Sequence, residues 1–273
     1  PTIRLSDVVA VGEATIVYDK EGNEIDQYVS TNSNRLSVGM DEIPDYLGKA
    51  FVAIEDERFY QHNGIDVKGI LRAGYQFIKT GGEEAQGAST ITQQLLKNTV
   101  FTDWTSEGNN KIKKIKRKIQ EQYLALEITK YYSKDEILLR YMNAINLGQN
   151  TLGVESASLR YFGKHCSDLT LSECAVIASI TQNPSKYNPI RHPEDNAVRR
   201  EKCLNKMLEL GFVSQSEYDE AMADTDAVYE RIGLYDIDYQ EANATTGSYF
   251  SDAVYEQVKQ DLILSGYNEA MAE

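Results

Sequence analysis

Hydrophobic and polar residues recur with a helical period through most of this chain of 273 residues. Between residues 45 and 54, Leu47, Ala50, Phe51 and Ile54 have the i, i+3, i+4, i+7 spacing that places side chains on one face of an α-helix. The same period predicts further helices at residues 66–78, 89–98, 111–132, 133–146, 151–161, 171–181, 193–210 and 214–223. The pattern therefore predicts a mainly α-helical fold.

Short polar signals mark the ends of some helices. Asp66 is placed to cap the helix at 66–78, and a Gly-Gly pair at 81–82 is placed to end it. Ser133 and Glu136 have the spacing of a capping box, which predicts that a new helix begins there.

The chain is expected to have three parts. Residues 1–44 form an entry segment, in which 15–18 and 24–25 flank a Gly-Asn turn and predict a short β-hairpin. Residues 45–223 form the helical domain, and residues 224–273 are polar and acidic and are interpreted as a linker towards a further domain. A hydrophobic fraction of 41% is enough for a packed core and excludes a disordered chain.

Charge is unevenly placed. Residues 201–273 hold 16 acidic and 4 basic side chains, so most of the net charge of −14 lies in this quarter. Residues 111–118 instead hold six positive charges. Nucleic-acid binding needs a broad basic face, so it is not expected here. The basic block suits a localised anion such as a pyrophosphate, although a charge run by itself is more often a solvated helix face.

Two groups of carboxylates are candidates for chemistry. Glu55, Asp56 and Glu57 follow an apolar helix face directly, and their mutual repulsion is expected to raise at least one pKa towards the range of a general base. Glu121 follows Arg117 by four residues, so the two share a helix face. The common alternatives are an exposed acidic helix end and a surface ion pair.

Residues 87–94, Gly-Ala-Ser-Thr-Ile-Thr-Gln-Gln, place hydroxyl and amide side chains at the start of a helix. Free N–H groups at such a start attract phosphate or sugar oxygens, although ordinary capping gives the same pattern. The three histidines have no zinc-binding spacing, and Cys166 and Cys174 are interpreted as buried thiols.

These motifs occur in the order known for one family. They stand at residues 55–66, 87–98, 117–121, 133–138, 141–143, 161–164, 171–180 and 183–189. On them the chain resembles the glycosyltransferase domain of class A penicillin-binding proteins, which is glycosyltransferase family 51. The chain departs from the family at Ala88, where a second glycine is usual, and at residues 145–146, where an aromatic residue is frequent.

The resemblance implies an enzyme that polymerises lipid II into β-1,4-linked glycan strands. Inversion at the donor C1 and release of undecaprenyl pyrophosphate accompany each step. Glu55 matches the general base, and Glu121 matches the second family glutamate, which orients cations or helps to hold Mg²⁺ or Mn²⁺; no organic cofactor is expected. The remaining matches are substrate-binding residues: Arg72, Lys97, Arg117 and Lys118 for the pyrophosphate, and Ser89, Thr90, Gln93, Gln94 and Asn98 along the cleft.

The resemblance also implies a lysozyme-like helical lobe with a smaller, membrane-proximal jaw. Apolar residues at 65–78 belong either to the lipid-facing jaw or to the core. The implied setting is the extracytoplasmic face of a bacterial cell membrane, in a protein with an N-terminal membrane helix and a C-terminal transpeptidase domain. No serine here is followed by lysine three residues later, so transpeptidase activity is not expected of this chain.

Two alternatives remain open. A lysozyme-type glycoside hydrolase also uses two carboxyl groups on a helical fold, but its substrate has no pyrophosphate. A non-enzymatic module that binds anionic lipid through residues 111–118 would give Glu55 no role.

Overall fold

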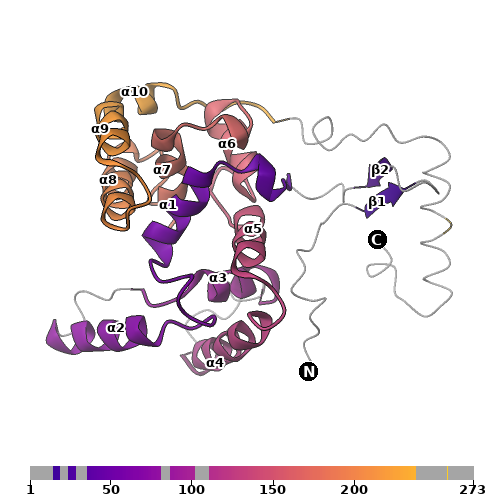
Figure 1. The fold of residues 1–273 in the computed structure, drawn as a ribbon, viewed down its shortest axis with the longest axis vertical. Coiled ribbons are helices and arrows are strands. Elements are labelled where there is room, and N and C mark those ends of the chain that lie inside the picture. Colours follow the sequence, from indigo (N-terminus) through magenta and orange to yellow (C-terminus); the bar gives the residue numbers. More distant parts are fainter. Residues whose placement is uncertain are drawn as a thin grey trace.

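The computed structural model describes residues 15–18, 24–28, 36–80, 87–101 and 111–237, together with residue 257. In this part of the chain helices dominate, as predicted (Figure 1). Strand β1 (Thr15–Tyr18) pairs antiparallel with β2 (Glu24–Tyr28), with Thr15 opposite Tyr28. The predicted hairpin is therefore present and β2 runs past Ile25, whereas the predicted turn and the glycines at 81–82 lie outside the described residues.

The predicted helices are present with shifted ends. In chain order they are α1 (Asp45–Glu55), α2 (Val67–Lys79), α3 (Ile91–Thr99), α4 (Lys111–Ile128), α5 (Lys134–Ala144), α6 (Val154–Phe162), α7 (Leu171–Ser179), α8 (Pro193–Glu209) and α9 (Gln215–Ala223). Short 3₁₀ turns, η2 (Met40–Glu42) and η4 (Cys166–Asp168), precede α1 and α7.

Polar caps set the starts of several helices. Ser133 accepts from the backbone N–H of Glu136 while the Glu136 carboxylate accepts from the N–H of Ser133, which is the predicted capping box. The Asp66 carboxylate accepts from the N–H of Gly69 at 2.9 Å and caps α2 as predicted.

The core of the body is built around α7. Each of its residues is buried, which is expected of a helix that is packed on all sides. Figure 1 shows α1 and α7 in the middle, α8 and α9 on one side, and α5 and α6 on the other. The aromatic rings of Phe51 on α1 and Tyr141 on α5 pack edge to face at 5.6 Å, which ties α5 to the central helices.

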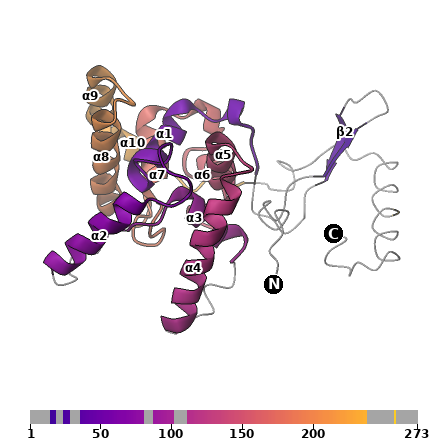
Figure 2. The ribbon, with the colours of Figure 1, turned by 60° about the horizontal axis from the view of Figure 1, so that its bottom comes forward.

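Helices α2 and α4 lie at one side of this body, away from α9 and α10 (Figures 1 and 2). Gly69 is the one buried residue of α2, whereas Val67, Leu71, Tyr75 and Ile78 are exposed, Ile78 to 81%. The core interpretation of residues 65–78 is therefore wrong for α2, because its apolar stripe faces outward. In the described part of the chain, no helix combines the length and the apolar composition needed to cross a bilayer.

The body continues beyond residue 223. Helix α10 (Thr225–Glu230) was not predicted, and it packs the fully buried side chain of Val228 against the core. The hydroxyl of Tyr229 donates to Asn196 Oδ1 at 2.6 Å, and the N–H of Tyr235 donates to the carbonyl of Arg160 at 3.1 Å. The segment interpreted as a linker from 224 thus begins as a packed part of the helical body.

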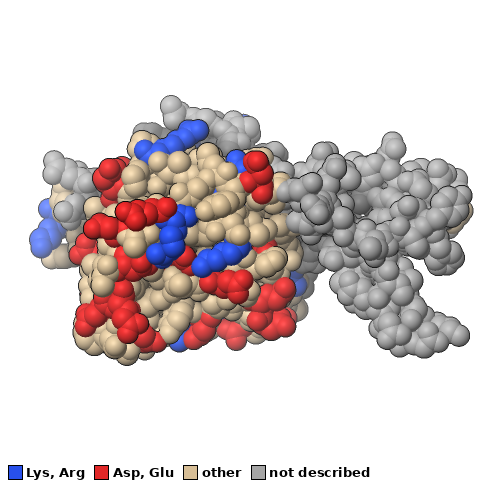
Figure 3. All heavy atoms as spheres, turned by 90° about the horizontal axis from the view of Figure 1, so that it is seen from above, with Lys and Arg blue, Asp and Glu red and all other residues tan. Residues whose placement is uncertain are grey.

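Acidic side chains dominate one face of the molecule. In Figure 3 they form several patches, and the Lys and Arg side chains are scattered among these patches and at the edges of the molecule instead of forming one broad basic area.

Candidate active site

Glu55 is the last residue of α1, and its carboxylate accepts hydrogen bonds on both oxygens. Oε1 accepts from Arg199 Nη2 at 2.6 Å and from the hydroxyl of Thr181, and Oε2 accepts from Gln94 Nε2 at 2.9 Å. Both the Glu55 and the Arg199 side chains are only 9% exposed. Three donors from three parts of the fold therefore hold the carboxylate in one orientation.

Arg199 and Thr181 were not predicted as site residues. Arg199 also donates from Nη1 to Gln182 Oε1 at 2.9 Å, and Gln182 has a φ of 61°, which is rare for a residue other than glycine. A signal for Arg199 was present in the sequence, since it lies on the same stripe of α8 as the buried Cys203. An arginine on an apolar stripe needs a buried partner.

The three successive carboxylates at 55–57 do not share one environment. The Asp56 carboxylate accepts from His62 Nε2 at 2.9 Å and from the N–H of Ile91 at 3.0 Å, at the start of α3. Because the N–H of Gly64 donates to His62 Nδ1, both ring nitrogens of His62 have partners, and the pair fixes the start of α3.

Glu57 accepts from Arg72 Nη1 at 2.9 Å and from Arg58 Nη1 at 2.6 Å. The hydrogen bond from Arg72 is the main cause that lowers the pKa of Glu57, with further lowering by the charges of Arg72, Lys206 and Arg58. Glu57 is therefore not the carboxyl group whose pKa the crowding raises, because nearby cations outweigh its acidic neighbours.

Cations gather around the second predicted glutamate. Glu121 is fully buried on α4, and its carboxylate accepts from Arg117 and, at 2.7 Å, from Lys118 Nζ. Lys118 Nζ also donates to Ser89 Oγ at 3.2 Å. The pKa of Lys97 is lowered first by burial and then by the positive charges of Lys118 and Arg117. We call Lys97, Arg117, Lys118 and Glu121 the cation cluster; it holds three positive charges and one negative charge.

Arg72 takes a different position from the other three predicted cations. It is half-exposed on α2 and pairs with Glu57 instead of Glu121. The structure thus brings three of the four predicted cations together, and it places the fourth beside the carboxylates that follow α1.

Glu121 does not fit the role of metal ligand. Each of its two oxygens already accepts a hydrogen bond from a cation. Among the described residues, no group of three or more His, Cys, Asp or Glu side chains is placed to hold a metal ion. In this arrangement Glu121 orients Arg117 and Lys118.

The polar residues at the start of α3 have two different roles. Thr90 and Gln93 are buried in a reciprocal capping box, and the Thr90 hydroxyl donates to the carbonyl of Gly64 at 2.7 Å. Ser89 and Gln94 instead contact the site, through Lys118 and Glu55 respectively. Asn98 is half-buried on the same helix.

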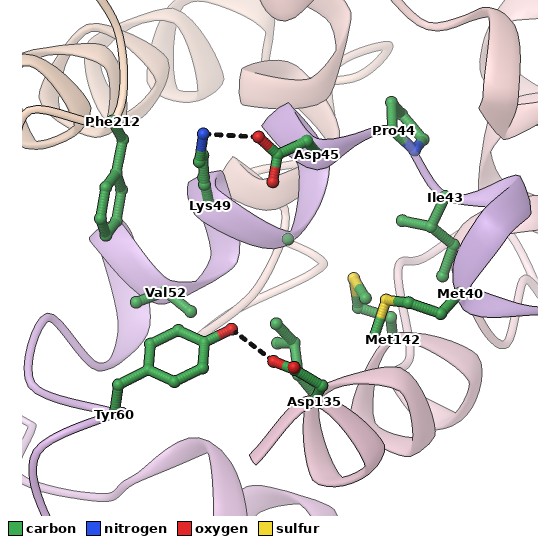
Figure 4. Close-up of a pocket in the computed structure, with 12 residues that line it drawn as sticks. Met40, Ile43, Pro44, Asp45, Lys49, Val52, Tyr60, Asp135, Met142 and Phe212 are labelled. Carbon is green, nitrogen blue, oxygen red and sulfur yellow. Dashed lines mark hydrogen bonds and ion pairs between the residues drawn. The ribbon is translucent and has the colours of Figure 1, made fainter. Parts of the chain in front are cut away.

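A separate pocket of about 320 Å³ lies over another part of α1 (Figure 4). Its walls include Lys49, Val52 and Phe212, and the hydroxyl of Tyr60 donates to Asp135 Oδ1 at 3.0 Å across it. None of the predicted site residues lines this pocket, so it is distinct from the two centres at Glu55 and Glu121.

A family model described as "Transglycosylase" matches residues 21–208, which include both glutamates and Arg199. The chain belongs to this transglycosylase family. Penicillin-binding protein 1A of Clostridium botulinum is 40% identical over 270 residues, which cover 96% of this chain and 31% of that protein. Penicillin-binding protein 1F of Bacillus subtilis is 41% identical over 201 residues, 74% of this chain and 27% of that protein. These relatives confirm the family resemblance seen in the motifs.

This chain spans about a third of the length of the curated relatives that it matches. Among solved structures, the 2.6 Å crystal structure of penicillin-binding protein 1A from Haemophilus influenzae is 22% identical, with a TM-score of 0.44. That comparison covers 96% of this chain and 26% of the other.

Proposed function

We propose that this domain is a peptidoglycan glycosyltransferase that joins lipid II units into a β-1,4-linked glycan strand. The proposal rests on one observation, that α3 contributes side chains to two neighbouring sites. One is the buried carboxylate of Glu55, and the other is the positively charged cation cluster. A glycosyl transfer that releases a pyrophosphate needs a base and an anion-binding site within reach of one substrate.

In the proposed reaction, Glu55 accepts the proton of the acceptor's 4-hydroxyl. The hydroxyl oxygen attacks C1 of the donor sugar, and the bond between C1 and the phosphate oxygen breaks. The pyrophosphate leaves with the electron pair, and attack from the opposite face inverts the configuration at C1. Gln94, Thr181 and Arg199 hold the Glu55 carboxylate, so little reorganisation is needed when the acceptor arrives.

The cation cluster stabilises the leaving group. Lys97, Arg117 and Lys118 supply charge-assisted hydrogen bonds to phosphate oxygens, which strengthen as negative charge develops on the pyrophosphate. The ion pairs of Glu121 keep Arg117 and Lys118 in place, and the cluster as a whole retains a net positive charge. A divalent ion bound to the pyrophosphate itself would neutralise part of its charge.

The membrane is the proposed location of this chemistry, because the substrate carries a polyprenyl chain. The exposed apolar stripe of α2 supports a position in the lipid interface. On α4, Ile115, Ile119 and Tyr123 are also exposed beside exposed lysines such as Lys114. Apolar side chains flanked by cations are typical of a helix on an anionic bilayer.

The proposed setting is the outer face of a bacterial cell membrane, in a longer protein that also carries a membrane helix and a transpeptidase domain. The names and lengths of the relatives support a longer penicillin-binding protein. Lipid II and the nascent glycan strand are the proposed partners.

A lysozyme-type glycoside hydrolase is the alternative function. It would share the buried carboxylate of Glu55 but would have no use for three cations beside it.

One experiment separates the two functions. The purified domain is incubated with fluorescent lipid II and divalent metal in detergent, and the products are separated on a gel. The transferase forms a ladder of polymer that is lost in the Glu55→Gln variant. Cleavage of added glycan strands without any polymer would instead support the hydrolase.

A further inference from the structure

The Gln94 side chain makes two different hydrogen bonds. Its Nε2 donates to Glu55 Oε2 at 2.9 Å, and its Oε1 accepts from the hydroxyl of Tyr141 at 3.2 Å. Tyr141, Gln94 and Glu55 thus form a chain that runs from α5 through α3 to the end of α1. The direction of each bond follows from the ionised carboxylate, which accepts hydrogen bonds and cannot donate one.

Tyr141 is held rigidly at one end of this series of hydrogen bonds. Its side chain is fully buried, and its ring packs edge to face on Phe51, which lies one turn before Glu55 on α1. Burial, and the nearby charge of Glu55, raise the pKa of Tyr141 well above its usual value, so its hydroxyl remains a donor at any working pH.

We propose that Tyr141 is a positioning residue for catalysis, which acts on Glu55 through the amide of Gln94. The proposal rests on the proposed role of Glu55 as the base, and it assigns a function to a tyrosine that does not touch the carboxylate. With its oxygen held by Tyr141, the Gln94 amide keeps its N–H groups turned towards Glu55. If the amide turned over, its oxygen would face the carboxylate and the Tyr141 hydroxyl would lose this acceptor.

The role of Tyr141 differs before and after Glu55 takes the proton of the acceptor. While Glu55 is ionised, the carboxylate itself favours the N–H side of Gln94. Once Glu55 has taken the proton from the acceptor, that preference weakens, and Tyr141 is the group that holds the amide for the next cycle. Loss of its hydroxyl should therefore slow turnover more than it weakens substrate binding.

Several charged or titratable groups among the described residues interact with Glu55 or lie next to it. They are Arg199 and Cys203 on α8, Tyr141 on α5 and the adjacent Asp56. The Tyr141→Phe change leaves the other three in place, so a change in the pH profile reports on the Tyr141–Gln94 link.

The test compares Tyr141→Phe with Tyr161→Phe. Tyr161 is equally buried, and its hydroxyl donates to the carbonyl of Leu147 at 2.7 Å instead of to a site residue. The two changes remove the same atom from the core, so they are matched for size and burial. Both proteins are assayed for lipid II polymerisation across pH, and their thermal unfolding is recorded.

We expect Tyr141→Phe to lower kcat about tenfold with little change in KM. The acidic limb of its kcat profile should move to higher pH, because a hydrogen bond to the ionised form has weakened. Tyr161→Phe should change stability without moving this limb. In a Gln94→Ala background, the added Tyr141→Phe change should have little further effect on kcat, since the link is already broken.

Equal kcat values and equal pH profiles for the two tyrosine variants would overturn the proposal. So would a full effect of Tyr141→Phe in the Gln94→Ala background. If Glu55→Gln itself kept wild-type turnover, the proposed function would fail instead, which distinguishes the two failures.

Discussion

Gln94 and Lys97 lie one helical turn apart on α3 and serve different halves of the site. Gln94 donates to Glu55 at 2.9 Å, whereas Lys97 lies close enough to Arg117 and Lys118 for their charges to lower its pKa. A single rigid helix thus sets the separation between the Glu55 carboxylate and the cation cluster. That helix is fixed at its start by the hydrogen bond from the N–H of Ile91 to Asp56, the residue that follows Glu55.

The first prediction concerns the base. Glu55→Gln keeps the shape of the side chain but removes its ability to take a proton. We expect turnover to fall by roughly two to four orders of magnitude, the usual range for loss of a general base, with the fold intact by circular dichroism. Turnover within a few-fold of wild type would remove Glu55 from the mechanism.

The second prediction concerns the cation cluster. Lys97→Ala and Arg117→Ala should each weaken binding of a moenomycin-type phosphoglycolipid about tenfold or more, because each removes a charge-assisted hydrogen bond to phosphate. Lys114→Ala is the matched control, since Lys114 is an exposed lysine of α4 outside the cluster. Equal affinities for all three variants at low salt would show that the cluster does not hold the phosphate.

The third prediction concerns Arg199. Its guanidinium joins Glu55 to Gln182 in a buried ion pair. Arg199→Ala should destabilise the domain by about 3–5 kcal/mol, because it leaves a buried carboxylate without its cation. Arg199→Lys keeps the charge, but a lysine does not have the two guanidinium nitrogens that donate to Glu55 and Gln182. We therefore expect a smaller loss of stability together with a loss of kcat of about tenfold or more.

Chemical denaturation and polymerisation assays on the same samples measure both effects. A fully active and fully stable Arg199→Ala variant would contradict this account of the site.

The fourth prediction concerns pH. His165 Nδ1 lies 2.6 Å from Glu155 Oε1, and this hydrogen bond raises the pKa of His165 from 6.5. A group with a raised folded-state pKa stabilises the fold fully below its unfolded pKa, and the contribution is lost as pH rises through the folded value. His165 is 74% exposed, so the effect is under about 1 kcal/mol.

Unfolding curves of wild type and His165→Gln should therefore differ at pH 5.5 and converge at high pH. A difference that grew with rising pH would have the wrong sign for this ion pair.

The fifth prediction concerns the membrane. Leu71→Asp and Ile78→Asp, on the exposed stripe of α2, should reduce sedimentation with anionic vesicles several-fold without loss of stability. Val198→Asp is the control, because Val198 on α8 is also an exposed apolar residue, at 72%. Equal loss of binding in all three variants would point to general charge repulsion instead of a docking face.

The sequence predicted the helices better than it predicted which side chains contact one another. The helical period located the helices because it is a local property, and the capping box at Ser133 was found for the same reason. The stripe of α8 indicated that Arg199 needs a buried partner, but the partner itself was missed because Glu55 lies 144 positions away and no local pattern identifies it. Helix α10 was missed because it is short and acidic, with Val228 as its one buried side chain.

The motif residues were found from the family resemblance, but their individual roles needed the fold. Thr90 and Gln93 stand beside Ser89 and Gln94 in the motif, and only packing shows that the first two are buried in a cap. Arg72 has the residue type of a phosphate ligand, and its contact with Glu57 appears only once α2 is placed.

The exposed stripe of α2 also sets the conditions under which this domain can be handled in the laboratory. A continuous apolar face in water is covered when two molecules meet, so without lipid or detergent we expect the domain to self-associate as its concentration rises. Mild detergent should return it to monomers by coating the same side chains. Kinetic constants taken from detergent-free samples would then describe clusters of molecules whose exposed α2 helices cover one another.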